Sequence, residues 1–170
     1  MANTFELIAS STVGAGGAAS IDFTSIPSTY TDLVLKISAR SSRAASTWDN
    51  TQLKVNNSTA NMTNRYLSGN GASAASGNLT VSYIGDIPAT GATSNTFANQ
   101  EIYIPNYAGS TNKSISVDSV AENNGTTAYA YFDANLWSQT TAINQLTIFS
   151  GNGDNFAQYS TAYLYGVKNA

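Results

Sequence analysis

The chain has 170 residues, of which 42% are apolar, so it is long enough to bury a sizeable hydrophobic core. It contains no cysteine and no histidine, which excludes disulfide bonds, thiolate metal sites and a Ser–His–Asp catalytic triad. The net charge of −3, with 7 scattered basic residues, excludes the basic footprint that nucleic-acid binding needs.

Apolar and polar residues alternate along most of the chain, which is typical of strands with one buried and one solvated face. In Leu33–Ala39, for example, Leu33, Leu35 and Ile37 are expected on the buried face, with Lys36 and Arg40 pointing outward. In chain order the predicted strands are Phe5–Leu7, Ala19–Phe23, Leu33–Ala39, Gln52–Val55, Leu79–Ile84, Glu101–Ile104, Ser114–Val120, Ala128–Leu136, Leu146–Phe149 and Thr161–Val167. No window shows a clear helical period, so we predict an all-β fold: an antiparallel, jelly-roll-like β-sandwich of about ten short strands in one domain, residues 1–170.

The connections between these strands carry turn residues. Gly14–Gly17 is expected to be a flexible turn, and Asn123-Asn124-Gly125 has the sequence of a β-hairpin turn. Two longer segments, Thr59–Asn78 and Asp86–Asn99, are predicted to be irregular loops. Because loops of this length are uncommon in compact domains unless they carry function, we expect both to contact a partner.

The two ends of the chain give further predictions. Residues Met1–Glu6 lack the basic and apolar regions of a signal peptide, and no apolar run is long enough to span a membrane, so neither is expected. Tyr159–Val167 has apolar or amphipathic residues on both faces. This pattern predicts a strand that lies between two neighbours and not at a free edge.

The sequence offers few candidates for a catalytic or metal site. Glu101 and Asp118 lie on predicted strands and could face each other, as the two carboxylates of a glycosidase do, but we interpret them as charges that keep the sheet soluble. The oxygen-rich segments Gly151–Asn155 and Trp48–Asn50 can in principle hold Ca²⁺, yet neither has EF-hand spacing and both fit simple turns. We therefore predict a protein that is not an enzyme and needs no cofactor.

Aromatic residues in polar segments suggest a binding surface. Trp48, in a predicted polar loop after Arg43, and Tyr66 could stack against sugar rings, whereas Trp137 ends an aromatic-rich strand and is expected to pack in the core. The candidate binding residues are Trp48, Asp49, Arg43, Tyr66 and Asn70.

Three segments carry a resemblance to a known group of proteins. Phe23–Leu35 (Phe-Thr-Ser-Ile-Pro-Ser-Thr-Tyr-Thr-Asp-Leu-Val-Leu), Ile104–Tyr107 and Tyr159–Lys168 (Tyr-Ser-Thr-Ala-Tyr-Leu-Tyr-Gly-Val-Lys) resemble, in this order, segments of small virion structural proteins of tailed bacteriophages, especially cyanophage-like ones. The shared motifs are short: a turn and two strands without catalytic residues.

The resemblance implies a structural virion protein, either a capsid decoration (cement) protein or a tail-appendage component that docks on the particle surface. Its implied partners are other capsid or tail proteins and further copies of the chain as a homo-oligomer, with no nucleic acid and no membrane. The alternative is a receptor- or carbohydrate-binding module at a tail-fibre tip, which would bind a host-surface glycan through Trp48 and the Ser68–Ser76 segment.

Overall fold

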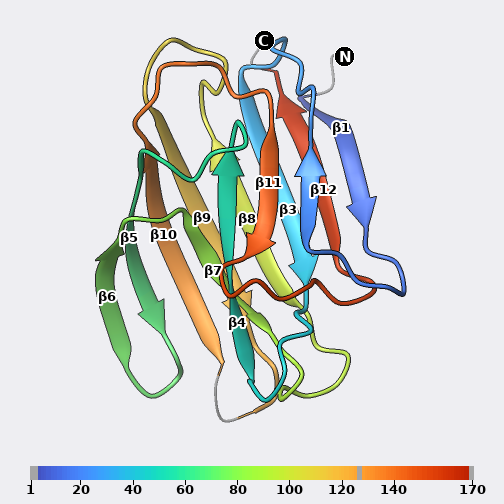
Figure 1. Ribbon diagram of the computed structural model, residues 1–170. Helices are drawn as coiled ribbons and strands as arrows, with labels where there is room; N and C mark the ends of the chain where they lie inside the picture. Colours follow the sequence, from blue (N-terminus) through green and yellow to red (C-terminus); the bar gives the residue numbers. More distant parts are fainter. Residues whose placement is uncertain (1–3, 126–127, 169–170) are drawn as a thin grey trace.

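The computed structural model describes residues 4–125 and 128–168, which form twelve β-strands in two antiparallel sheets (Figure 1). The predicted all-β antiparallel sandwich is confirmed, with twelve strands where about ten were expected. The described residues include no helix that is long and apolar enough to cross a membrane.

The larger sheet has eight strands in the order β1-β12-β3-β8-β9-β10-β5-β6. In that order the strands are β1 (Phe5–Thr12), β12 (Thr161–Val167), β3 (Asp32–Ala39), β8 (Ala98–Ile104), β9 (Lys113–Ala121), β10 (Tyr129–Trp137), β5 (Met62–Gly69) and β6 (Ala74–Leu79). The start of β1 and the end of β12 therefore lie side by side (Figure 1).

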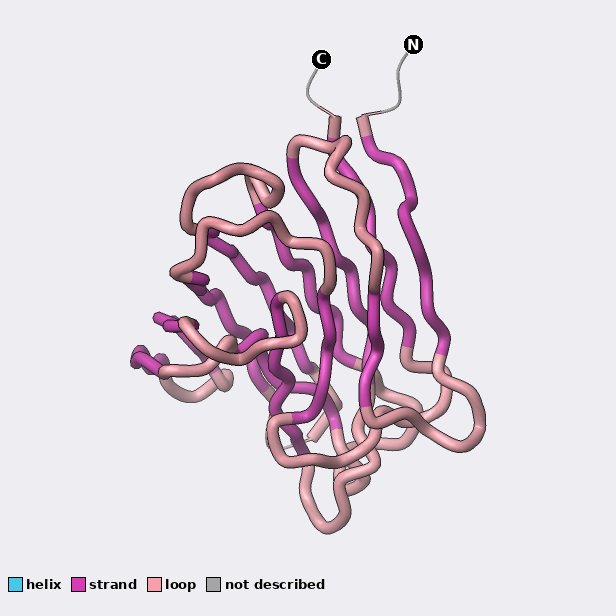
Figure 2. The backbone as a smooth tube through the Cα atoms, turned by 45° about the horizontal axis from the view of Figure 1, so that its top comes forward, coloured by secondary structure: helices cyan, strands magenta, loops and turns pink. Residues whose placement is uncertain are grey.

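The smaller sheet has four strands in the order β2 (Ser20–Phe23), β11 (Leu146–Ser150), β4 (Trp48–Val55) and β7 (Tyr83–Pro88). Its last strand, β7, packs against β8, β9 and β10 of the larger sheet. Strands β5 and β6 extend beyond it, and Figures 1 and 2 show them at one side of the sandwich. The sheets thus enclose a core over most of the molecule but leave β6 and the second half of β5 without buried residues.

The predicted burial of alternate residues in β3 is confirmed. Leu33, Leu35 and Ile37 are at most 2% exposed, whereas the Lys36 side chain is 53% exposed. Arg40 differs from the prediction that it points outward: it is half-buried, and its guanidinium donates to backbone carbonyls of residues 89–96 at 2.7–3.2 Å. Arg40 therefore holds the loop that joins β7 to β8.

The prediction for the C-terminal strand is also confirmed. Strand β12 pairs with β1 on one side and β3 on the other, and both ladders are antiparallel. Ala162 and Leu164 are fully buried, while Tyr163 on the opposite face is 38% exposed. The strand is thus an interior member of the larger sheet.

The prediction that Thr59–Asn78 is a single long loop is wrong. Most of it forms the β5–β6 hairpin, with only residues 70–73 as the turn between the two strands. The hairpin has no hydrophobic alternation, because the buried inward position of Asn64 is occupied by an amide that bonds to the Tyr83 carbonyl and to Asp133, Tyr66 follows it on the same face, and β6 consists mainly of small residues. Polar and small residues without a period of two resemble a loop.

Three smaller predictions are corrected in the same region. Strand β7 runs to Pro88, so the predicted loop Asp86–Asn99 shortens to residues 89–97. The predicted strand Leu79–Ile84 is interrupted by residues 80–82 between β6 and β7. Trp48 is not in a loop but begins β4, where it alternates with buried residues. The predicted Asn123–Gly125 turn lies between antiparallel strands β9 and β10, and Asn124 has the expected positive φ of 53°, but Gly125 does not have a positive φ, so the pair does not form a two-residue type I′ turn.

Candidate functional site

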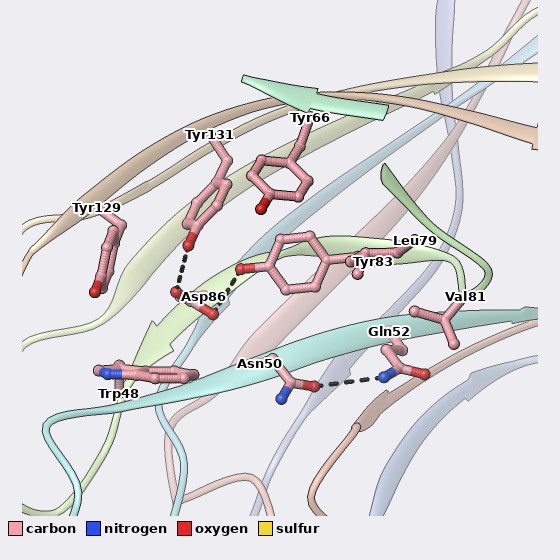
Figure 3. A pocket seen from close by; sticks show the side chains of 10 residues that line it. All are labelled: Trp48, Asn50, Gln52, Tyr66, Leu79, Val81, Tyr83, Asp86, Tyr129 and Tyr131. Carbon is pink, nitrogen blue, oxygen red and sulfur yellow. Dashed lines mark hydrogen bonds between the residues drawn. The ribbon is translucent and has the colours of Figure 1, made fainter. Parts of the chain in front are cut away.

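A groove opens where the smaller sheet ends above the larger one, and Figure 3 shows its walls. It encloses about 420 Å³, within the range of ~300–1,000 Å³ that is common for small-ligand sites. One wall comes from β4: Trp48, Asn50 and Gln52 are half-buried on its outer face, while the alternate residues of this strand point into the core. The period of two thus places an indole and two amides side by side.

The opposite wall comes from the part of the larger sheet that the smaller sheet leaves uncovered. Tyr129 and Tyr131 lie two residues apart on the inward face of β10, and Tyr66 lies on the inward face of β5. Tyr131 lies at the centre of these rings, with its centroid 5.6 Å from that of Tyr129 and 6.1 Å from that of Tyr66. Trp48 meets Tyr129 edge-on at 6.2 Å, so the two walls join at this end of the groove.

Asp86 and Tyr83, both from β7, form the floor between the two walls (Figure 3). The hydroxyls of Tyr83 and Tyr131 donate to the two carboxylate oxygens of Asp86 at 2.6 and 2.9 Å. Burial and the Asp86 charge raise the pKa of both tyrosines above the ordinary value, so both hydroxyls remain donors at neutral pH. The two bonds therefore hold the tyrosine rings of different sheets in fixed positions around one carboxylate.

Two buried carboxyl groups, Asp86 in the groove and Asp133 on β10, have a raised pKa. Burial is the main reason that the pKa of Asp86 is raised to about 6, and the nearby Asp49 charge adds to it, against the two tyrosine hydrogen bonds. Burial likewise raises the pKa of Asp133 to about 7, and Asp86 adds to this through its charge. Asp133 is fully buried on β10 and accepts a 2.9 Å hydrogen bond from the amide of Asn64.

These two carboxyl groups predict an unusual pH dependence of stability. In an unfolded chain both would ionise near pH ~3.9. Because the folded protein holds these protons up to about pH 6 and 7, it binds more protons than the unfolded chain in this range, and its stability falls as the pH rises from about 4 to 8. We expect thermal melting curves to give a higher Tm at pH 5 than at pH 8.

The variant Asp133→Asn tests the source of this slope. It keeps the acceptor for Asn64 and removes the ionisable group, so we expect it to be roughly 1–4 kcal/mol more stable than the parent protein at pH 8. Asp118→Asn, on the exposed face of β9, is the matched control and should leave the slope unchanged. Equal slopes for Asp133→Asn and the parent would contradict the assignment.

The predicted binding residues fall into three places. Trp48 and Tyr66 both line the groove, on opposite walls. Arg43 stacks on Trp48, with its guanidinium carbon 5.5 Å from the centre of the indole ring, and its guanidinium lies 3.8 Å from the Asp49 carboxylate. Asp49 is fully buried on the other face of β4, and Asn70 lies in the β5–β6 turn, where it accepts from the backbone N–H groups of residues 72 and 73. The structure therefore brings together Trp48, Tyr66 and Arg43, but not Asn70.

Asp49 connects the two oxygen-rich segments that the sequence offers as candidate Ca²⁺ sites, Trp48–Asn50 and Gly151–Asn155. Its carboxylate accepts hydrogen bonds from Ser41, Ser150 and Asn152 at 2.6–2.8 Å. These donors take up both oxygens, so Asp49 fixes the 151–155 turn against β4. In the described part of the chain, no three acidic side chains gather in the manner of a metal site.

Glu101 and Asp118 do face each other, as the sequence allowed: they lie directly opposite on β8 and β9, on the exposed face of the larger sheet, where Glu101 forms a 2.8 Å ion pair with Lys36. Their interpretation as charges that keep the sheet soluble stays a prediction, whereas the prediction for Trp137 is confirmed. Trp137, at the end of β10, is only 4% exposed and belongs to the core.

Sequence reasoning missed Tyr83, Asp86, Tyr129 and Tyr131. One signal was present in β10, where Tyr129, Tyr131 and Asp133 alternate with Ala130 and Phe132. The polar series faces inward and the apolar series faces outward, the reverse of an ordinary half-buried strand. Such an inverted strand indicates that its inner face lines a polar site.

No protein-family model matches this chain, and the comparison with curated proteins finds no significant relative. The groove is therefore interpreted from its own residues.

Proposed function

We propose that this chain is a virion protein of a tailed bacteriophage and that its groove binds a carbohydrate. The virion setting is supported by the resemblance of Phe23–Leu35 and Tyr159–Lys168 to phage structural proteins. The ligand class is supported by one observation: Trp48, Tyr66, Tyr129 and Tyr131 surround a groove that also offers amides and a carboxylate.

This combination matches the chemistry of a sugar. A pyranose ring has apolar C–H faces, which pack against aromatic rings, and a rim of hydroxyls, which need donors and acceptors. Asn50 and Gln52 offer both donor and acceptor atoms, and the tyrosine hydroxyls, two of them held by Asp86 on the floor, add further polar atoms. Their positions beside Trp48 allow stacking and hydrogen bonding to act on one ligand together.

The charge of the groove favours a neutral sugar. Among the described residues that line the groove, Asp86 is the one carboxylate, and none is a lysine or an arginine. Arg43 stacks on Trp48 and its charge reaches Asp86, but Asp49 lies 3.8 Å from its guanidinium and offsets that charge. Asp86 would therefore repel a negatively charged sugar or a phosphate. We therefore expect neutral glycans to bind and acidic glycans to bind more weakly.

A glycan array with the purified protein tests the proposal. Trp48→Ala and Tyr129→Ala should each lower the affinity for the bound glycan at least tenfold, because stacking on each ring is lost. Tyr159→Ala, which removes a tyrosine that is 68% exposed and not in the groove, is the control and should bind like the parent protein. Unchanged binding by Trp48→Ala, with an unchanged circular dichroism spectrum, would contradict the assignment.

A second candidate function is capsid decoration without a glycan, and one feature favours it. The outer face of the larger sheet exposes an apolar patch around Leu67 and Phe132, which lie opposite each other on β5 and β10 and are 57% and 58% exposed. Exposed patches of this kind often mark protein–protein contacts. High copy number in purified particles together with no binding on the array would favour decoration over glycan binding.

A further inference from the structure

The four edges of the two sheets differ in how they are protected against pairing with another chain. Strand β1 carries a bulge between Leu7 and Ala9 and a charged residue, Glu6, which is tied to Lys168. Strand β2 is only four residues long and exposes Asp22. Strand β7 is buried along its whole length and ends at Pro88. Short length, bulges, charges, proline and cover are the usual means of protecting an edge.

Strand β6 (Ala74–Leu79) has none of these protections. It contains no charge and no proline, and its ladder with β5 runs without a bulge. All of its residues except Gly77 are exposed. Because β6 is last in the order of the larger sheet, its outer side has no strand partner within the described residues. Half of its backbone N–H and C=O groups therefore point away from the molecule.

We propose that β6 pairs in antiparallel fashion with β6 of a second copy across a twofold axis and joins the two larger sheets into one. Residues that lie opposite each other in an antiparallel pair point to the same face of the sheet, and the twofold axis keeps each residue on its face. The axis must therefore pass between a residue and the identical residue of the second copy. The central residues of β6 are Ser76 on the outer face and Gly77 on the inner face, and the axis is placed beside Ser76, because the Tyr66 ring already covers Gly77. The neutral sequence places no like charges opposite each other in either register.

A second copy fits this edge better than an unrelated strand would. The first four residues of β6, Ala74 to Gly77, are small and the whole strand is uncharged, so it offers no pocket for the large side chains of a foreign peptide. Alanine, glycine and asparagine have low strand propensity, so the side chains of β6 stabilise the strand only weakly. A second ladder of backbone hydrogen bonds would stabilise it further.

The groove would lie beside this contact. Tyr66 covers Gly77 so closely that a Cβ atom added there would lie 2.6 Å from the tyrosine hydroxyl, and Leu79 at the end of β6 also lines the groove. A twofold axis perpendicular to the joined sheet puts both smaller sheets on the same side. The two grooves would therefore open on one face of the dimer, next to each other, although the pairing itself does not depend on a sugar ligand.

The small area of the β6–β6 contact predicts a weak dimer. Six paired residues extend over only ~20 Å, so the interface is smaller than the ~1,200 Å² at the lower limit of stable specific interfaces. We expect a weak dimer with a dissociation constant on the order of 0.1–1 mM. Such a contact is significant where many copies are held close together.

Sedimentation equilibrium without any sugar tests the pairing at protein concentrations up to about 1 mM. The mean mass of the parent protein should rise with concentration. Ser76→Lys and Ser76→Glu should each stay monomeric, because two like charges would meet across the axis, and an equimolar mixture of the two should associate again. Ser114→Lys, the same change on the exposed face of interior strand β9, is the control and should associate like the parent.

Two results would overturn the proposal. One is a parent protein that remains monomeric at about 1 mM, and the other is Ser76→Lys that associates as strongly as the parent while its melting temperature is unchanged. Recovery in the mixture of Lys and Glu variants distinguishes β6–β6 pairing from a loss of folding. Because no glycan is present, the outcome is independent of the array experiment on the groove.

Discussion

A chain that ends at Ser160 is expected to be insoluble or unfolded. The truncation removes β12, which lies between β1 and β3 and completes a ladder on each side. It also removes Leu164, which is fully buried opposite Leu35. Buried backbone groups that lose their partners cost ~1–3 kcal/mol each, and several such losses exceed a whole-domain stability of ~5–15 kcal/mol.

A chain that ends at Val167 is the control for this truncation. It keeps both ladders and loses the ion pair of Lys168 with Glu6, whose side chains are 44% and 35% exposed, together with the backbone bond from Lys168 to Thr4. An exposed ion pair contributes little to stability, so this chain should melt close to the full-length protein. A soluble, cooperatively melting chain ending at Ser160 would show that β12 is peripheral and that an arm exchanged with a neighbouring subunit is the better description.

Leu35→Ala is expected to lower the free energy of unfolding by ~2–5 kcal/mol, and Leu35→Lys to prevent folding. Leu35 is 0% exposed and lies between Leu164 of β12 and Ile102 of β8 in the register of the larger sheet. Its removal leaves a cavity at the centre of the core, and a lysine there would bury an unpaired charge.

Urea unfolding followed by tryptophan fluorescence measures the effect of Leu35→Ala, since Trp137 is buried and will be exposed on unfolding. The neighbouring position supplies the control: Lys36 points to the other face and makes an exposed ion pair with Glu101, so Lys36→Ala should change stability by less than ~1 kcal/mol. If Leu35→Lys melted at the temperature of the parent protein, the assigned register of β3 would be wrong by one residue.

The sequence predicted strands well where the two sheets cover each other. In β3 and β12 the core face requires apolar residues at every second position, and the predicted ranges agree closely with the structure. Toward the β6 edge of the larger sheet this requirement disappears. Asn64 is buried there in a polar cluster with Asp133, and Tyr66 is only half-buried, so the β5–β6 hairpin shows no apolar period and its sequence predicts a loop.

The candidate site was predictable only in part for a related reason. Trp48 and Tyr66 stood out because they are aromatic residues in polar surroundings. Tyr83, Asp86 and Tyr131 come together only because β7 packs across β10, a contact between sheets that no local pattern specifies. Asp86 was assigned to a loop, although it forms the floor of the groove.

The position of β12 between β1 and β3 has a consequence for the order of folding. Phe5 pairs with Val167 and Leu7 with Tyr165, so the first strand has no ladder until the last one has been synthesised. Contacts between residues so distant in sequence slow folding, because a long loop must close before they form. During synthesis β1 and the exposed side of β3 therefore remain available to other chains, and we expect refolding in vitro to be slow and its yield to fall as the protein concentration rises.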